Sequence, residues 1–320
     1  MVRRALKGFC AEPIWELTVL HRNQDTCGRV PYGANFLNMA TVPFFIPDTE
    51  FMSPLTEAQE EALFRDDLPK VRYQNNPLEV VVCEVRFPPI LRIDTELPSR
   101  FQEAVRDNFP LFTESSPLSF APAEVMRILG AANVLPTSNK TYHFASANQE
   151  WTVALNRELL SLSCRKYTRW KEFSAKLDEP LKALQSLYKP QFYLRVGLRY
   201  RDVISRNNLG LQGVPWGELL QQGIVGEFHT PIAPLVAAAW HQVLLKLKKG
   251  NTQIVLQHGL QLNPMTRESC YVFDTDFSTQ SRTEPANVHD TLGYFNKRSW
   301  YFFRTFIADR LHNAMQPESI

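Results

Sequence analysis

The sequence predicts an α+β protein made of two tandem β-α-β-β-β-α repeats, residues 78–190 and 191–320. Each repeat is expected to form a curved antiparallel sheet packed on one long helix. Three observations predict this fold class. A β-branched run opens each repeat, three extended segments with short connections follow it, and a helix with an apolar stripe closes it.

The composition excludes several classes of protein. Apolar residues make up 44% of the chain and aromatic residues 12%, which is typical of a globular protein rather than a disordered one. No segment approaches the ~18 consecutive apolar residues of a membrane helix, so no membrane partner is expected. The net charge is 35 − 33 = +2, and any basic surface must therefore be local. Five cysteines without a short spacing, and no export signal, favour the cytoplasm.

The first fifty residues differ from the rest of the chain. Residues 1–51 carry scattered prolines and no regular apolar period, so this N-terminal extension could not fold alone. It is either a docking arm that packs on the body or a poorly ordered extension. Residues 52–77 are expected to be a linker with a short helix, in which Ser53 is the cap and Pro54 the first helical residue.

In the first repeat, a β-branched strand begins at Leu78 and is ended by Pro88 and Pro89, which cannot donate to a sheet. A short helix follows Pro98. A meander is then expected from three extended segments, and a long helix comes after them that is kinked or restarted at Pro180. The three segments and the helix span residues 140–146, 150–156, 159–164 and 168–188.

The second repeat shows the same order, and Val85-Arg86-Phe87 in the first strand corresponds to Leu198-Arg199-Tyr200 in the second. Such similarity suggests duplication. The two halves could form one continuous sheet across a pseudo-two-fold axis, a saddle similar in topology to that of the TATA-binding proteins. Its segments are a strand at 192–204, a short helix near 216–221, strands at 236–247, 252–262 and 270–277, and a helix at 288–315.

Several short motifs occur in a fixed order along residues 78–315. They are Glu84-Val85-Arg86-Phe87-Pro88-Pro89, Phe144-Ala145-Ser146, Tyr167-Thr168-Arg169-Trp170-Lys171-Glu172-Phe173, Arg195-Val196-Gly197-Leu198-Arg199-Tyr200 and Phe273-Asp274-Thr275-Asp276. As a set, these motifs resemble an uncharacterised, sporadically distributed bacterial protein family. The resemblance implies no established enzymatic activity and no catalytic residues. Scattered occurrence is typical of horizontally moved defence or conflict genes.

Signatures of common enzyme classes are absent from the sequence. There is no GxxxxGK[ST], GxGxxG, HExxH or GxSxG segment, and no two histidines share the three- or four-residue spacing of ligands on one helix, so no cofactor is expected. The best metal candidates are Asp274 and Asp276, which project from one face of the last strand. The alternative for this pair is a polar strand edge in water, or pairing with arginine.

Two groups of cations are candidate anion-binding or nucleic-acid-binding sites. Arg165, Lys166, Arg169 and Lys171 surround the predicted start of the first long helix, where they oppose the helix dipole unless an anion or facing carboxylates bind them. The alternative is a solvated surface. In the second repeat, Arg195, Arg199 and Arg201 share one face of a strand, either to bind phosphate or an acidic partner, or to pair with Glu84. Gly197 between them would allow a close approach.

These observations favour a non-catalytic binding or adaptor protein of the bacterial cytoplasm. It would be an accessory component of a defence or conflict module and would engage a protein partner from the same gene module, or nucleic acid. The alternative is a metal-dependent nuclease or nucleotide-processing enzyme that uses Asp274 and Asp276.

Overall fold

The computed structural model describes residues 56–64, 69–115 and 140–319. Every described residue belongs to one compact unit of the chain, residues 54–320. The predicted N-terminal extension and the predicted Ser53 cap therefore lie outside the described residues.

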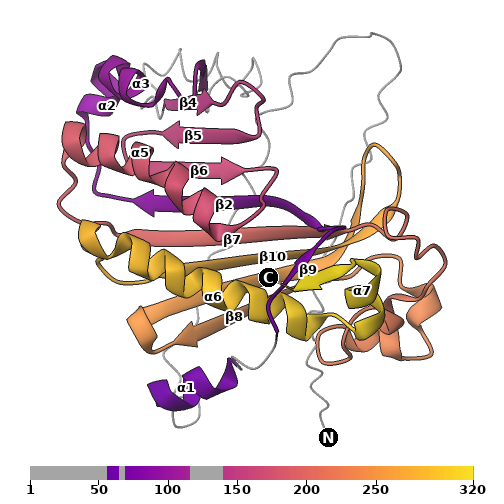
Figure 1. Ribbon diagram of the computed structural model, residues 1–320. Coiled ribbons are helices and arrows are strands. Elements are labelled where there is room, and N and C mark those ends of the chain that lie inside the picture. Colours follow the sequence, from indigo (N-terminus) through magenta and orange to yellow (C-terminus); the bar gives the residue numbers. More distant parts are fainter. Residues whose placement is uncertain (1–55, 65–68, 116–139, 320) are drawn as a thin grey trace, which may run out of the picture. The chain divides into compact units, whose positions relative to one another are not determined.

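A large antiparallel sheet forms the centre of this unit, which confirms the predicted α+β class. Nine strands lie in the order β3-β4-β5-β6-β2-β7-β10-β9-β8, and all neighbours are antiparallel (Figure 1). The strands are β2 (Leu78–Arg86), β3 (Leu111–Ser115), β4 (Thr141–Ala145), β5 (Trp151–Leu155), β6 (Leu159–Cys164), β7 (Arg195–Ile204), β8 (Trp240–Leu247), β9 (Thr252–Leu262) and β10 (Ser269–Thr279).

The opening strands of the two predicted repeats, β2 and β7, lie side by side at the middle of the sheet. Their register pairs Glu84 with Gly197 and Arg86 with Arg195. Every second residue of each strand is buried, as the alternation in the sequence predicts. The two predicted repeats therefore share one sheet.

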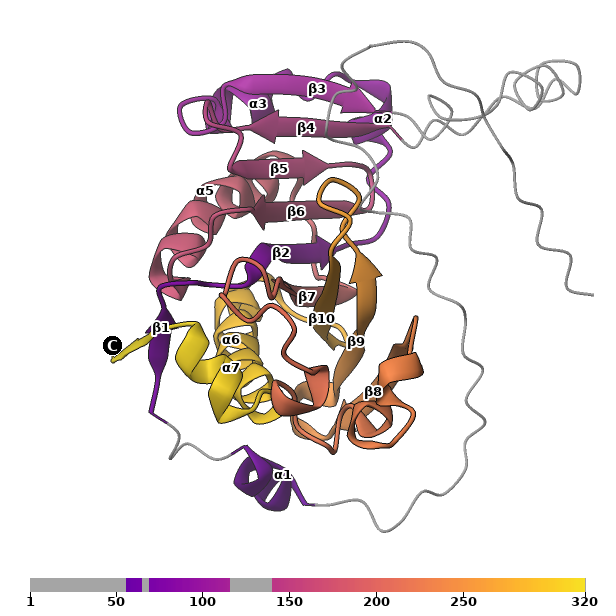
Figure 2. The same ribbon diagram turned by 90° about the vertical axis from the view of Figure 1, so that its right-hand side faces the viewer.

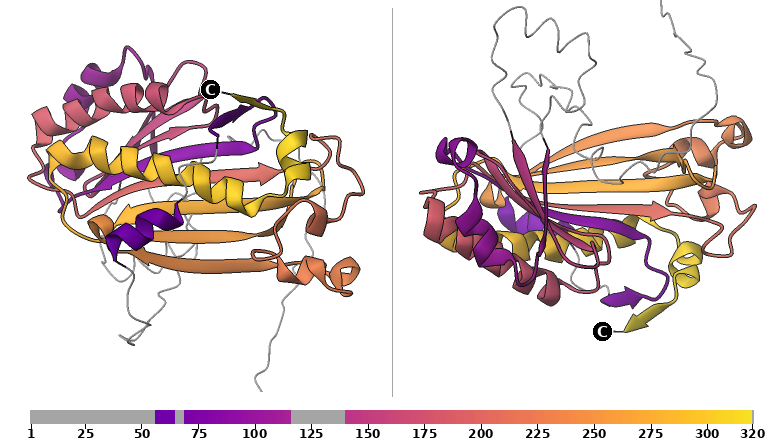
Figure 3. Two further views of the ribbon diagram at one scale, coloured as in Figure 1. Left: turned by 60° about the horizontal axis from the view of Figure 1, so that its bottom comes forward. Right: turned by 90° about the horizontal axis from the view of Figure 1, so that it is seen from above.

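Two long helices cover one face of the sheet, as Figures 1 and 3 show. Helix α5 (Trp170–Tyr188) packs on β6 and on the short helix α3 (Ser99–Val105), and α6 (Val288–Phe306) packs on β7 and β10. Their apolar stripes bury Phe173 and Leu177 from α5, and Leu292 and Phe295 from α6. Among the described residues, no helix packs on the other face of the central strands. The sequence predicted a kink or a restart at Pro180, and the structure shows no restart, because one helix runs through this buried proline.

The last predicted helix, residues 288–315, is two helices. Helix α6 ends at Phe306 because Ile307 turns to an extended conformation, with φ −98° and ψ 144°, and bridges Leu220. The chain then re-enters a helix as α7 (Asp309–Ala314), and the Ala308 N–H donates to the Leu219 carbonyl at 2.9 Å. A bond to a segment far away in the sequence thus replaces a helical turn.

The remaining helices and strands are short. Strand β11 (Pro317–Ser319) pairs with β1 (Val71–Tyr73) in a separate two-stranded sheet, as seen from the side in Figure 2. The predicted helix near Trp216 is the 3₁₀ turn η2 (Trp216–Glu218), and β3 was not anticipated. Further short helices are α1 (Glu57–Leu63), α2 (Arg92–Thr95), and the 3₁₀ turns η3 (Gly226–His229), η4 (Ala233–Leu235), η5 (Lys249–Asn251) and η6 (Pro285–Asn287).

Candidate functional site

The face of β2, β7 and β10 that lies opposite α5 and α6 carries a row of ion pairs, which we call the charged ladder. Because side chains alternate along a strand, Val196, Leu198 and Tyr200 are buried beneath the helices. The arginines between them project from the opposite face, as predicted. The ladder consists of Arg86, Arg195, Arg199, Arg201, Glu79, Glu84, Asp274 and Asp276.

Arg195 joins three strands. Its guanidinium donates to Glu84 Oε1 at 3.0 Å and to both carboxylate oxygens of Asp276 at 2.8 and 2.6 Å. Arg86 donates to the same Glu84 oxygen at 2.6 Å. Pairing with Glu84, one of the two alternatives that the sequence leaves open for these arginines, is therefore formed by Arg195.

Gly197 makes room for this bridge. A Cβ atom at position 197 would lie 2.2 Å from Nη1 and 2.7 Å from Cζ of Arg195. The guanidinium therefore lies flat across the backbone of its own strand. The close approach expected at this glycine is made by a side chain of the same protein.

A second set of pairs lies further along β7. Arg199 donates through Nε and Nη2 to the two oxygens of Asp274 at 2.6 and 2.5 Å, a bidentate geometry that favours both charged forms. This hydrogen bond raises the pKa of Arg199 above its ordinary value. Arg201 pairs with Glu79, lies 3.8 Å from Asp274 and donates to Gln261 at 2.5 Å.

Asp274 and Asp276 project from one face of β10, as predicted, but each carboxylate is held by an arginine. Within residues 56–64, 69–115 and 140–319, no group of three or more His, Cys, Asp or Glu side chains is arranged to hold a metal ion. The arrangement therefore matches the alternative in which the two aspartates pair with arginine.

The second group of cations lies on the connection from β6 to α5. Lys166 pairs with Glu150 at 3.4 Å, and Arg169 is the residue before the first helical turn but makes no capping bond with its side chain. Arg169 and Lys171 are exposed, and neither forms an ion pair in the part of the chain that the structure describes. The connection leads to the helix-covered face, so the structure does not bring this group together with the arginines of β7.

Asp202 was not singled out from the sequence, although it lies in phase with Leu198 and Tyr200 on the buried side of β7. It is 9% exposed. Burial, assisted by the charge of Asp274, raises the pKa of Asp202 to about 8. A carboxyl group at an apolar position of an alternating strand is the signal that would have identified it.

Two histidines also meet across a strand pair. The β8–β9 register pairs His241 with His258, and their rings stack with centroids 4.9 Å apart. His258 Nδ1 lies 2.8 Å from the Tyr271 hydroxyl, and His241 Nε2 lies 2.9 Å from Glu227 Oε1. Burial and then the neighbouring His241 lower the pKa of His258 to about 4. Helical spacing could not reveal this pair, because it depends on the register of a hairpin.

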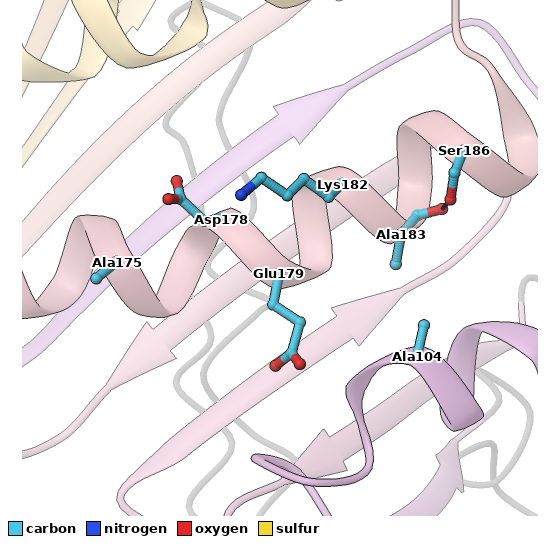
Figure 4. A pocket seen from close by; sticks show the side chains of 7 residues that line it. All are labelled: Ala104, Ala175, Asp178, Glu179, Lys182, Ala183 and Ser186. Atoms are coloured by element: carbon cyan, nitrogen blue, oxygen red, sulfur yellow. Dashed lines mark hydrogen bonds between the residues drawn. The ribbon is translucent and has the colours of Figure 1, made fainter.

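A groove lies between α3 and α5. Figure 4 shows Asp178 and Lys182 on one side of α5, and Glu179 and Ala183 on the side that faces Ala104 of α3. Asp178 lies 3.1 Å from His289, and Glu179 accepts a bond from Asn108 at 2.8 Å. These carboxylates tie the helices together.

Comparison with models of known protein families finds no match for the chain. Comparison with curated proteins also finds no match. No helix within the described ranges combines the length and the apolar character that crossing a membrane requires.

Replacing Asp202 by Asn should stabilise the protein at neutral and alkaline pH. The carboxyl ionises near pH 4 when unfolded but near pH 8 when folded, so its contribution to stability falls as pH rises through this window. The gain over the wild type should grow from pH 5 to pH 8 and reach several kcal/mol, since one pKa unit corresponds to about 1.4 kcal/mol. Urea unfolding at both pH values measures it, with exposed Asp107→Asn as the control. An equal gain at both pH values would contradict this assignment.

The effect of His258 has the opposite sign. Its folded pKa of about 4 lies below the unfolded value near 6.5, so its contribution is complete above pH 6.5 and is lost as pH falls toward 4. The wild type should lose about 3 kcal/mol of stability through His258 as the pH falls, and His258→Gln should reduce this loss. Asp202→Asn should make the net loss larger, because the opposite contribution of Asp202 is then absent. Unfolding of both variants between pH 4 and 7 tests the signs; parallel pH profiles for the two variants would refute them.

Gly197→Ala should destabilise the protein by displacing Arg195 from its carboxylates, at a cost of about 1.5–3 kcal/mol. In an Arg195→Met background the same change should cost nothing, because alanine in an extended strand restricts the unfolded chain more than glycine does. A double-mutant cycle by urea unfolding measures the coupling. Additive effects would show that the Ala methyl group disturbs something other than Arg195.

Proposed function

We propose that the chain is a non-catalytic binding or adaptor protein that engages a protein partner through the charged ladder. One observation carries this proposal: the acidic and basic side chains of the ladder neutralise one another. Four arginines face four carboxylates, so the ladder has a formal charge of 4 − 4 = 0. The same pairs occupy the carboxylates that a metal-dependent enzyme would need.

A mixed, pre-organised polar surface suits a protein partner better than a polyanion. A phosphate would have to displace a bidentate carboxylate from Arg195 or Arg199, and nucleic-acid affinity depends mainly on unneutralised cations. Arg86, whose side chain is 51% exposed, and Arg199, at 36%, keep donor groups accessible to a neighbouring protein. Arginine is frequent at protein interfaces for this reason.

Nucleic-acid binding remains a second candidate because of Arg169 and Lys171. These exposed cations lie at the start of α5, where the N–H groups of the first helical turn also favour anions. Two or three phosphate contacts at this place would produce weak binding with a modest dependence on salt.

We also propose that the two halves arose by duplication and form a saddle-like arrangement with a pseudo-two-fold axis between β2 and β7. The strand order supports this: outward from β2 lie β6, β5 and β4, and outward from β7 lie β10, β9 and β8. In each half, a helix of 19 residues follows the last strand of the large sheet. The resemblance to a sporadic bacterial family supports a cytoplasmic role in a defence module, with the partner encoded in the same module.

Partner binding at the charged ladder can be tested in the presence of the products of the neighbouring genes. A tagged chain should retain a specific partner that Arg86→Glu loses, while Lys246→Glu, an exposed charge on β8, should retain it. Circular dichroism and thermal melting confirm the fold of each variant. Equal retention of the partner by both variants would contradict binding at the ladder.

The alternatives have their own readouts. The purified protein should not turn over DNA, RNA or nucleotides with Mg²⁺ or Mn²⁺; turnover that Asp274→Asn and Asp276→Asn abolish in folded protein would overturn the proposal. Binding to nucleic acid in a salt series tests Arg169→Gln and Lys171→Gln against Lys182→Gln, an exposed control on the same helix. If only Arg169→Gln and Lys171→Gln reduce the dependence of affinity on salt, nucleic-acid binding at the start of α5 is established.

A further inference from the structure

Helix α1 occupies a surface formed by α6 and the β8–β9 turn, which we call the α1 cradle. The cradle consists of Lys248, Lys249, Tyr294, Arg298, Tyr301 and Phe302. It lies apart from the charged ladder, so a role for the cradle goes beyond the proposed function and does not depend on it. Figure 3 shows α1 beside α6 and the strands at that edge of the sheet.

The contacts between α1 and the cradle are electrostatic. Both carboxylate oxygens of Glu60 accept the Lys248 backbone N–H at 2.9 Å, and Glu60 is only 7% exposed. Glu61 accepts from Lys249 Nζ at 2.9 Å and from Arg298. Burial acts to raise the pKa of Glu61, but the bonds from Lys249 and Arg298 leave it below its ordinary value.

Aromatic rings complete the cradle. The Arg298 guanidinium lies between two rings, with its Cζ 4.9 Å from the Phe64 centroid and 3.6 Å from the Tyr294 centroid. The Phe64 ring, directly after α1, packs 5.6 Å from both Tyr301 and Phe302. Arg298 is 5% exposed, and its Nε has no hydrogen-bond partner among the described residues.

Helix α1 resembles a bound peptide more than a part of the core. Its seven residues are fewer than the ~12–15 that an isolated helix needs for marginal stability in water. It begins with a capping box between Thr56 and Gln59, but its only buried residue is Glu60, whereas Leu63 is 56% exposed. Its position therefore depends on these charge contacts and on Phe64 rather than on an apolar helix face packed in the core.

We propose that the α1 cradle is a docking site for an acidic amphipathic helix that ends in an aromatic residue, and that α1 is its reversible occupant within the same chain. The partner is a protein helix with the pattern of residues 57–64, Glu-Ala-Gln-Glu-Glu-Ala-Leu-Phe. Charge complementarity supports this choice: the cradle presents Lys249, Arg298 and the Lys248 backbone N–H, and α1 presents three glutamates. Such a helix would displace α1 by taking over the same contacts.

A labelled peptide with the sequence of residues 54–66 tests the proposal against the full-length protein. The occupied wild type should bind it weakly. A Glu60→Ala/Glu61→Ala/Phe64→Ala variant, whose own α1 is weakened, should bind it at least 10-fold more tightly by fluorescence anisotropy, and salt should reduce the affinity. A control peptide with Glu57, Glu60 and Glu61 replaced by Lys should not bind. No gain in affinity on weakening α1 would overturn the proposal.

The cradle side of the contact needs its own variants. Adding Arg298→Gln to the opened variant should abolish peptide binding, and Lys249→Gln should weaken it several-fold; Lys297→Gln, an exposed neighbour on α6, should change nothing. Lys249 lies in a surface turn, so its variant remains informative if the Arg298 variant does not fold. Peptide binding that is indifferent to both changes would refute the assignment.

Two further measurements distinguish the possible occupants of the α1 cradle. Hydrogen exchange of the Lys248 amide reports α1 docking within the chain and should accelerate when the Glu60→Ala change removes the carboxylate. Light scattering should detect no dimer of the wild type that is lost in the Phe64→Ala variant. A dimer of this kind would identify α1 of a second copy, rather than a helix of a partner protein, as the occupant of the cradle.

Discussion

The antiparallel pairing of β2 with β7 is the contact on which the rest of the unit depends. It joins strands that are more than one hundred residues apart and makes a single sheet from the two halves. Each strand directs Val85, Leu198 and their apolar neighbours toward the helices, so pairing also completes the core. The same register brings Glu84 beside Gly197, where the guanidinium of Arg195 can reach it. Core and ladder thus result from one alignment.

The charged ladder is best understood as three strands cross-linked on their solvent side. Three of the four arginines bind carboxylates on a neighbouring strand, whereas Arg86 binds Glu84 on its own strand. Asp274, whose side chain is 7% exposed, accepts both bonds from Arg199 in bidentate geometry. Removing one partner would leave the other poorly solvated, which is why such pairs are costly to break even when their net contribution to stability is small. A rigid pattern of paired charges also gives a binding surface specificity, because a partner must offer groups that match it without disrupting it.

The face covered by helices contains titratable groups with opposite behaviour. Asp202 is held neutral by burial, and His258 is held neutral by burial as well, but one has a raised and the other a lowered pKa. Both result from the low polarity of their surroundings, since an apolar environment disfavours whichever form carries charge. Neither belongs to the ladder. The protein therefore separates neutral buried polar groups from paired charges on the two sides of one sheet.

Much of the fold could be predicted because it follows from local patterns of apolar and polar residues. The alternation in β7 separates its arginines from Leu198 and Tyr200, and the apolar stripes of α5 and α6 identify both long helices. The break at Ile307 could not be predicted, since its cause is a bridge to Leu220. Thr56 caps α1 together with Gln59, a local pattern that the sequence also contains.

The sequence by itself determined which side chains share a face, because the period of a strand is a property of its covalent backbone. It placed Asp274 with Asp276, and Arg195 with Arg199, without showing how they meet. Only the tertiary structure decided that each aspartate pairs with an arginine and that His241 stacks on His258. These pairings depend on strand register, and register is set by how the whole apolar face packs beneath α5 and α6 rather than by any one segment.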